Sequence, residues 1–495
     1  MMDCFAKPGA AAVPIAAVAA ADFKTWLASQ DATVKAWIGA NDFAPKAGKY
    51  LAVPGPKGGL ALVVLGRGDK ASMWDFGDLP KALPAGRYRL EGMDGADDGD
   101  QATAAALAWA LGSYQFNRYK PGGEAKAKLV WPAAADRAKA EREAKGVYLC
   151  RDLINTPTND MGPADLADAA KELARAFKAK FKVIEGDQLL KKNYPAIHAV
   201  GRASDRAPRL IDFTWGPAKA PKVTLVGKGV CFDTGGLDIK GPAGMKFMKK
   251  DMGGAAHVLG IASVLMAAKA NIRLRVMIPA VENSISGNSM RPMDILPTRR
   301  GTTVEVANTD AEGRLILADA LWEAVAEEPE LLIDFATLTG AARVALGTDL
   351  PALFCNDDTL AADILAAGDG VEDPLWRMPL WDGYRPMVEG SQADLTNAPE
   401  GGYAGAITAA LFLEHFATPE KGKPIPWAHV DLMAWNRSSK PGRPMGGEAM
   451  GLRAMAGMIL ARFQGGPVVP AAAKPRRPRR AVTPTRPAKP TRKAR

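Results

Sequence analysis

Asn308-Thr-Asp-Ala-Glu-Gly-Arg-Leu315 is the segment that says most about the fold and chemistry of this 495-residue chain. It follows residues 302–307, whose β-branched composition predicts a strand. Side chains at alternate positions of an extended segment point to one side, so Asp310, Glu312 and Arg314 are expected to leave the strand end together. Two carboxylates beside a guanidinium are typical of sites for divalent metals and anionic transition states.

A second group of polar residues follows another predicted strand, at residues 222–227. Lys228, Asp233 and Lys240 lie there among glycines and apolar residues. Asp251 then opens an apolar helix predicted over residues 252–269, at or near its N-cap, where a carboxylate is favoured in any protein. Taken alone, Asp251 is therefore explained by capping.

Strands and helices alternate along most of the chain, which predicts an α/β protein built from two α/β domains. We expect an N-terminal α/β domain at 1–145, a linker helix region at 146–165 and a catalytic domain at 166–465. The catalytic domain should contain a central, mostly parallel sheet flanked by helices. Ligands of such sheets gather at the carboxyl ends of the strands, where both polar groups fall. Its predicted strands are residues 222–227, 272–281, 302–307, 331–336 and 429–434.

The net charge of +10 lies entirely in a Pro-rich tail, residues 466–495, which is predicted to be disordered. Residues 471–495 hold ten Lys or Arg and no acidic residue, so the rest of the chain is formally neutral. Such a tail could bind nucleic acid through phosphate contacts in a salt-sensitive way. It has no aromatic residue for base stacking, so binding would be non-specific. A solvated tail with no ligand is the simpler interpretation.

Cysteine usage and hydropathy predict a cytoplasmic protein without membrane association. Cys4, Cys150, Cys231 and Cys355 are scattered and form no C-x-x-C pair, which favours reduced thiols. The apolar run at residues 10–21 has only one preceding lysine and a proline inside it, unlike a signal peptide. No stretch approaches the roughly 18 uninterrupted apolar residues of a membrane helix.

The two polar groups together resemble the leucyl (cytosol) aminopeptidase family of dinuclear metallopeptidases, over roughly residues 150–465. The octapeptide at 308–315 is that family's signature, and the spacing of the second group also fits it. The resemblance implies two divalent ions per subunit, Mn²⁺ or Zn²⁺, with Mg²⁺ or Co²⁺ as alternatives. The metal ligands that it implies are Lys228, Asp233, Asp251, Asp310 and Glu312.

Elementary electrostatics fits this set of ligands. Four carboxylates in one site repel one another unless cations neutralise them. The unusual member is Lys228, because an ammonium group must lose its proton before it can bind a metal. On residue type alone, a salt bridge between Lys228 and these acids is the simpler alternative. The chain has four histidines and no H-E-x-x-H motif, so the site would be rich in oxygen ligands.

The resemblance also implies roles for the remaining polar residues. Lys240 would stay protonated and stabilise the oxyanion of the tetrahedral intermediate. Arg314 would hold a bicarbonate ion that acts as general base, although an ion pair with Asp310 or Glu312 is the alternative. Residues that match an apolar substrate pocket, and could equally be plain core, are Met248, Thr337 and Gly340.

Asp238 departs from the family pattern, which more often has a neutral polar residue two positions before Lys240. In an extended loop Asp238 would lie on the same side as Lys240 and could pair with it. Such a pair would raise the pKa of Lys240.

The sequence thus predicts a metal-dependent aminopeptidase that releases N-terminal residues, with Leu and other apolar residues preferred, from peptide substrates. The resemblance further implies a homohexamer. A nucleotide-binding enzyme is disfavoured because Gly227-Lys-Gly229 lacks the P-loop spacing. A nucleic-acid-binding protein acting through the tail and a scaffold without catalysis are the alternatives that remain.

Overall fold

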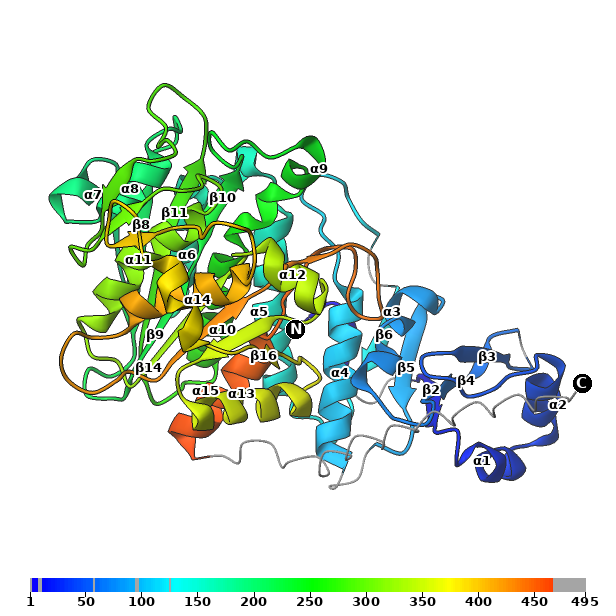
Figure 1. Ribbon diagram of the computed structural model, residues 1–495. Coiled ribbons are helices and arrows are strands. Elements are labelled where there is room, and N and C mark those ends of the chain that lie inside the picture. The colour runs from blue at the N-terminus through cyan, green and yellow to red at the C-terminus, as the bar shows by residue number, and fades with distance from the viewer. Residues whose placement is uncertain (1, 8–10, 57, 94–97, 124–125, 466–495) are drawn as a thin grey trace, which may run out of the picture.

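The computed structural model describes residues 2–7, 11–56, 58–93, 98–123 and 126–465, so the predicted tail lies outside the described residues. The chain forms two α/β lobes (Figure 1), a smaller N-terminal one in blue and cyan and a larger one in green to orange. The predicted fold class, two α/β domains, is confirmed. Among the described residues, no helix has the length and apolarity needed to cross a membrane.

The N-terminal lobe is built on a six-stranded sheet in the order β1-β6-β5-β2-β4-β3. All neighbouring strands are parallel except β3 and β4. The strands are β1 (Phe5–Ala6), β2 (Val13–Val18), β3 (Tyr50–Pro54), β4 (Leu60–Gly66), β5 (Gly86–Leu90) and β6 (Ala127–Val130). The helices are α1 (Phe23–Ser29), α2 (Ala32–Ala40), η1 (Met73–Phe76), α3 (Leu79–Ala82) and α4 (Gly99–Ser113).

Helix α5 (Arg137–Asn155) joins the lobes and packs against α4 on one side and α10 (Gly253–Ala267) on the other. Gly146 makes the second contact close, because a Cβ there would lie 2.9 Å from the carbonyl oxygen of Gly260. The expected boundary at 145 falls inside this helix, which runs from one lobe into the other without a break.

The larger lobe has a nine-stranded sheet in the order β16-β15-β18-β14-β9-β11-β8-β7, with β10 also paired to β11. The central strands β18, β14, β9 and β11 are parallel, as expected, whereas β15, β8 and β7 add antiparallel edges. The strands are β7 (Lys180–Glu185), β8 (Arg209–Trp215), β9 (Lys222–Gly227), β10 (Gly229–Asp233), β11 (Arg273–Asn283), β14 (Leu331–Ala336), β15 (Ala352–Cys355), β16 (Trp376–Arg377) and β18 (Trp427–Asp431).

Helices cover both faces of this sheet because its central strands are apolar on both sides. Leu225 of β9 and Ile333 of β14 pack in the cluster that contains α10. Their neighbours Val226 and Leu332 pack in the cluster that contains α11 (Glu312–Val325). Successive residues of a strand point to opposite faces, so α10 and α11 lie on opposite sides of the sheet.

The remaining elements complete the larger lobe. Its other helices are η3 (Thr158–Asp160), α6 (Pro163–Ala176), α7 (Gln188–Lys191), α8 (Pro195–Gly201), α9 (Pro242–Met245), η4 (Met248–Met252), α12 (Gly340–Leu346), α13 (Asp358–Gly370), η5 (Asp382–Val388), α14 (Gly405–Ala417) and α15 (Leu452–Gln464). Its small sheets contain β12 (Ile295–Pro297), β13 (Thr303–Glu305), β17 (Leu395–Thr396), β19 (Trp435–Asn436) and β20 (Gly446–Gly447).

Candidate metal centre

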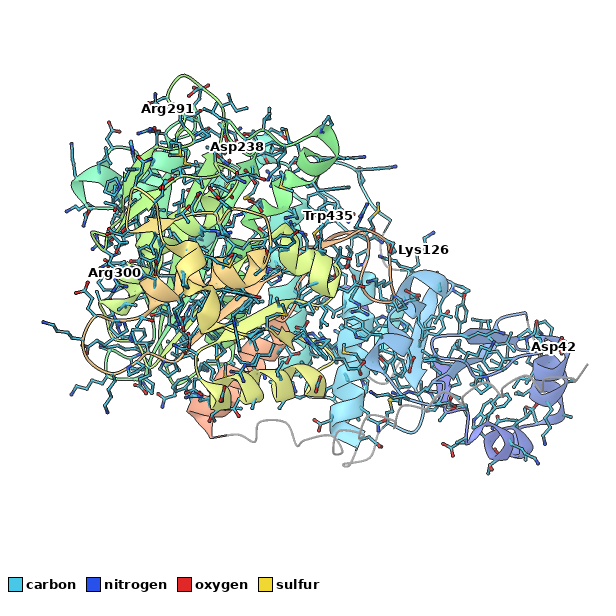
Figure 2. All side chains as sticks on the ribbon, viewed as in Figure 1. Asp42, Lys126, Asp238, Arg291, Arg300 and Trp435 are labelled. Atoms are coloured by element: carbon cyan, nitrogen blue, oxygen red, sulfur yellow. The ribbon has the colours of Figure 1, made fainter. Side chains whose placement is uncertain are left out.

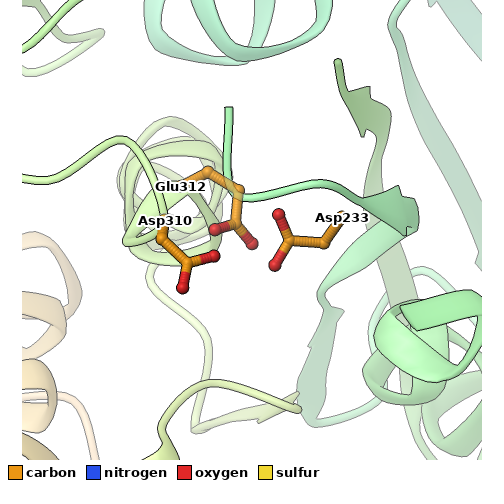
Figure 3. Close-up of side chains that lie close together, drawn as sticks. All are labelled: Asp233, Asp310 and Glu312. Atoms are coloured by element: carbon orange, nitrogen blue, oxygen red, sulfur yellow. The ribbon is translucent and has the colours of Figure 1, made fainter. Parts of the chain in front are cut away.

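Three carboxylates converge on one point, as Figure 3 shows. Asp233 ends β10, Asp310 lies in the loop after β13, and Glu312 is the first residue of α11. One carboxylate oxygen from each lies within 4.8 Å of the others. Carboxylate oxygens at this spacing could bind a divalent cation together.

The backbone conformation that carries Asp310 and Glu312 differs from the expectation. The predicted strand at 302–307 is shorter, and the chain then turns, so the octapeptide is not extended. The backbone N–H of Asp310 donates to Asn308 Oδ1 at 2.8 Å, and Glu312 and Arg314 lie on the first turn of α11. The predicted extended alternation at i, i+2 and i+4 was wrong because the strand ends at Glu305 and Asn308 then opens a side-chain-capped turn.

Lys228 follows β9 and is buried among the acids, with its Nζ 2.6 Å from Asp251 Oδ2 and 2.8 Å from Glu312 Oε1. Although burial opposes it, these carboxylates raise the pKa of Lys228. The ammonium group approaches closely because residue 313 is glycine: a Cβ there would lie 2.8 Å from Lys228 Nζ. The geometry is the salt bridge that the residue types alone favoured, at the position that the family resemblance assigns to a metal ligand.

The acids carry more negative charge than the lysines neutralise. Burial and the Asp233 carboxylate raise the pKa of Glu312 to about 8, and the same two causes raise that of Asp310 to about 6. Asp251 Oδ2 and Glu312 Oε1 are buried and share one ammonium group, that of Lys228. Raised carboxyl pKa values, and two carboxylates that share one ammonium group, are what divalent cations would correct, so the donor set fits a metal centre.

Lys240 lies across the same carboxylates. Its Nζ is 2.8 Å from Asp233 Oδ2 and also contacts Asp310 Oδ1. These contacts outweigh burial and raise the pKa of Lys240, so it is protonated at neutral pH, and its role at the oxyanion stays a prediction. A cation fixed here can donate to an oxyanion that forms nearby.

Arg314 is buried, and the alternative of an ion pair with Asp310 or Glu312 is not seen. Its Nε and Nη1 atoms have no hydrogen-bond partner, and burial lowers its pKa to about 10. No carboxylate in the described part of the chain lies within ion-pair distance of it. Unpartnered buried donors are costly, so the guanidinium is suited to holding a small anion.

Asp238 does not pair with Lys240, which corrects that expectation. Its Oδ2 accepts from the backbone N–H of Thr309 at 2.8 Å, and its own N–H donates to Thr309 Oγ1 at 2.8 Å. Gly235 and Gly236, with φ of +87° and +65°, turn the loop back so that Asp238 faces the octapeptide. Figure 2 labels Asp238 in the larger lobe. The residue therefore fastens two ligand-bearing loops together.

The three expected substrate-contacting residues lie in different settings. Thr337, 3% exposed, donates through Oγ1 to Asp251 Oδ1 at 2.7 Å, so it borders the metal centre. Gly340 is exposed at the start of α12, and Met248 is half-buried at the start of η4, the short helix that also carries Asp251. The structure thus places Thr337 and Met248 beside or within the segments that supply ligands.

Sequence reasoning missed Asn283, which orients the site from the end of β11. Its Nδ2 donates to Asp233 Oδ1 at 2.9 Å and to the carbonyl oxygen of Thr309 at 3.1 Å. A polar residue directly after a long apolar strand was the available signal, the same one that marked Lys228. Asn283 and Asp238 both hold Thr309, so a shell of hydrogen bonds fixes the segments that carry the predicted ligands.

Two domain families match this chain. Residues 148–456 match the catalytic domain of the cytosol aminopeptidase family, and residues 13–132 match the M17 aminopeptidase N-terminal domain. The chain is 40% identical over 419 residues to a probable cytosol aminopeptidase of Rhizobium meliloti. This match covers 79% of this chain and 83% of the relative. It is 39% identical over 371 residues to peptidase B of Serratia proteamaculans, covering 72% and 85%.

Solved structures agree over nearly the whole chain. The crystal structure of a cytosol aminopeptidase from Coxiella burnetii has a TM-score of 0.87 and 50% identity, and the match covers 93% of this chain and 100% of the other. The bottromycin maturation enzyme BotP in complex with Mn has a TM-score of 0.82 and 31% identity, with 92% and 100% covered.

Proposed function

This chain belongs to the cytosol aminopeptidase family and is an aminopeptidase, and from that premise we propose that it works through two divalent cations held by Lys228 and four carboxylates. One observation carries the proposal: carboxylate oxygens of Asp233, Asp310 and Glu312 lie within 4.8 Å of one another, and the pKa values of Asp310 and Glu312 are raised. Carboxylates this close repel one another unless cations neutralise them.

The donors suit several metals. Asp233, Asp251, Asp310 and Glu312 supply oxygen, and Lys228 would add an amine once its proton is displaced. Mn²⁺ and Zn²⁺ fit this set, and Mg²⁺ or Co²⁺ compete with them because no His or Cys selects zinc. The related BotP was solved with Mn. When bound, two such ions supply an activated water and polarise the scissile carbonyl.

The remaining groups would serve the reaction as follows. Lys240, kept protonated by Asp233 and Asp310, donates to the oxyanion of the tetrahedral intermediate. The open donors of Arg314 would hold bicarbonate, which would supply a general base beside the carboxylates. Thr337 keeps Asp251 oriented through its hydroxyl. Met248 and Gly340 border the side chain of the first substrate residue, where Leu and other apolar residues are accepted.

The proposal extends to assembly and location. Several large apolar side chains of the catalytic domain are exposed in the single chain, among them Trp376 at 58%, Trp381 at 60% and Tyr403 at 80%. Contacts between subunits would cover such groups, which supports self-assembly, and a homohexamer is the assembly that the family resemblance implies. The names of the relatives support a cytoplasmic location.

Hydrolysis of a leucine amide tests the proposal. Enzyme stripped by a chelator should be inactive, and Mn²⁺ or Zn²⁺ should restore activity. Glu312→Ala should stay inactive with either metal because it removes an oxygen ligand, while Glu330→Ala, in the loop before β14, serves as a matched carboxylate control that should respond like the parent. Folded enzyme that is inactive with every metal would contradict the proposal.

A further inference from the structure

A cavity of about 200 Å³ lies where the two lobes meet, and none of the predicted metal ligands lines it. Trp74 of η1 and Leu111 of α4 line it from the N-terminal lobe, and Arg151 lines it from α5, the helix that joins the lobes. The segment from β19 to α15, which includes Arg443, closes the cavity on the side of the larger lobe. The reaction described above uses none of these residues, so the cavity is a separate feature of the molecule.

The acidic groups of this cavity already have partners. The four carboxylates that line it belong to Asp349, Glu372, Asp373 and Glu448. Two of them form ion pairs, Asp349 with Lys440 and Glu448 with Arg151. The other two accept hydrogen bonds from backbone N–H groups at 2.8 Å. These contacts neutralise or satisfy the carboxylates without a ligand from outside the chain.

Arg443 is the cation of the cavity that lacks such a partner. Arg151 and Lys440 have the ion pairs just named, and Arg453 donates to two backbone carbonyl oxygens at 2.6 and 3.1 Å. The Arg443 side chain makes no hydrogen bond or ion pair with any residue that the structure describes, and its Nε is buried. A buried donor without a partner costs free energy, so this guanidinium is suited to receiving an anion from outside the chain.

Contacts between the lobes hold this guanidinium in place. The Cζ atom of Arg443 lies over the Trp74 ring, 4.3 Å from its centroid. Arg443 and Lys440 exchange backbone hydrogen bonds at 2.8 and 2.9 Å, and Gly77, just after η1, packs so closely that a Cβ there would lie 2.4 Å from the backbone nitrogen of Gly442. A guanidinium held against a ring keeps the N–H groups of its edge available, and these form the fork that binds two oxygen atoms of one anion.

We propose that this cavity is a binding site for a small oxoanion, a phosphate or a carboxylate, which Arg443 holds between the lobes. The volume of the cavity admits an ion of that size. Trp74 belongs to the N-terminal lobe and Arg443 to the larger one, so the bound anion would tie the two lobes together. The inference does not depend on the aminopeptidase reaction, because neither residue belongs to the metal centre.

Equilibrium dialysis of the full-length, metal-loaded enzyme against radiolabelled sulfate tests the proposal, with sodium chloride added to keep the ionic strength constant. Sulfate replaces phosphate in this experiment because phosphate would compete for the metal ions. The metal centre and the basic tail also attract sulfate, so the quantity of interest is the difference between the parent and a variant. The parent should bind about one more sulfate per chain than Arg443→Met, which removes the charge and the fork of donors.

Arg437→Met is the matched control. Arg437 lies in the same segment, is exposed and does not line the cavity, so this variant should bind as much sulfate as the parent. Arg443→Lys keeps the test open if Arg443→Met does not fold. A lysine keeps the positive charge but lacks the paired donors, so Arg443→Lys should bind this sulfate at least about tenfold more weakly than the parent.

Competition with acetate identifies the source of the anion. Displacement of the Arg443-dependent sulfate by acetate would indicate a carboxylate, and resistance to acetate would indicate a phosphate. Equal sulfate binding by the parent and both Arg443 variants would overturn the anion site. A decrease in Arg437→Met as large as that in Arg443→Met would also overturn it, because the effect would then be one of net charge. Neither result would affect the aminopeptidase proposal, which hydrolysis of the leucine amide tests.

Discussion

Asp238 links two ligand-bearing loops through Thr309, although neither residue is an expected ligand. Asp238→Ala should raise the metal concentration needed for half-maximal activity by about tenfold, because the loop that carries Asp310 loses its tie to the loop after Asp233. Asp238→Asn keeps one acceptor oxygen for the Thr309 N–H and should raise that metal concentration much less. Titration of stripped enzyme with Mn²⁺ measures both.

The pH profile of these variants should not move, because Asp238 contacts Thr309 and not Lys240. If Asp238→Asn changed the pH dependence of kcat while metal affinity stayed constant, the assignment of Asp238 as a positioning residue would be wrong.

At this scale, two polar groups that each follow a predicted strand were enough to expect Asp233, Asp310 and Glu312 close together, although the octapeptide is not extended. They could not predict the partner of Asp238, since the choice between Lys240 and Thr309 depends on how the two glycines turn the loop.

Helix α10 contains a buried histidine whose protonation should control stability. His257 Nδ1 contacts the carbonyl oxygen of Gly253 at 2.6 Å, and Nε2 accepts from the Met450 N–H at 2.8 Å, which fits a neutral ring. Burial lowers its pKa to about 4 from an ordinary value of 6.5. The stability that this ring contributes is therefore present above pH 6.5 and is lost as the pH falls towards 4.

The loss should amount to roughly 3 kcal/mol in the free energy of unfolding, from about 1.4 kcal/mol for each unit of pKa shift. Urea unfolding at several pH values in this window would measure it. His257→Gln should be less stable at neutral pH but should show a flatter dependence. Equal slopes for the parent and the variant would show that His257 does not titrate on unfolding.

Elements with continuous apolar runs were predicted well: their observed bounds agree with those expected from the sequence. The strands at residues 222–227 and 331–336 are found as predicted, because each is buried on both faces in the middle of the sheet. The strand at 302–307 ends at Glu305, and the N–H groups of Ala307 and Asn308 donate to the Asn397 side chain instead of to a neighbouring strand. Such a competition between side chain and strand is not visible in a β-branched pattern.

The two lobes are tied to the C-terminal segment by a buried ion pair. Arg151 of α5 donates to Glu448 through Nε at 3.1 Å and to the carbonyl oxygens of Leu111 and Gly442. Glu448→Gln leaves this fully buried guanidinium without its counter-charge and should destabilise the protein by about 3 kcal/mol. Urea unfolding of the full chain measures the change.

A second substitution checks the reason. Arg151→Met added to Glu448→Gln removes the unpaired charge and should recover part of the lost stability. If the double variant had a lower free energy of unfolding than Glu448→Gln, the packing of the Arg151 side chain would matter more to stability than its unpaired charge.

The central claim about the whole molecule is that the ends of the strands and the loops beyond them hold two metal ions per chain. Elemental analysis of enzyme equilibrated with Mn²⁺ or Zn²⁺ and freed of excess metal tests it most directly. The parent should retain about two ions per chain, and Glu312→Ala should retain fewer. A parent that binds no metal, or a variant that binds as much as the parent, would contradict the account.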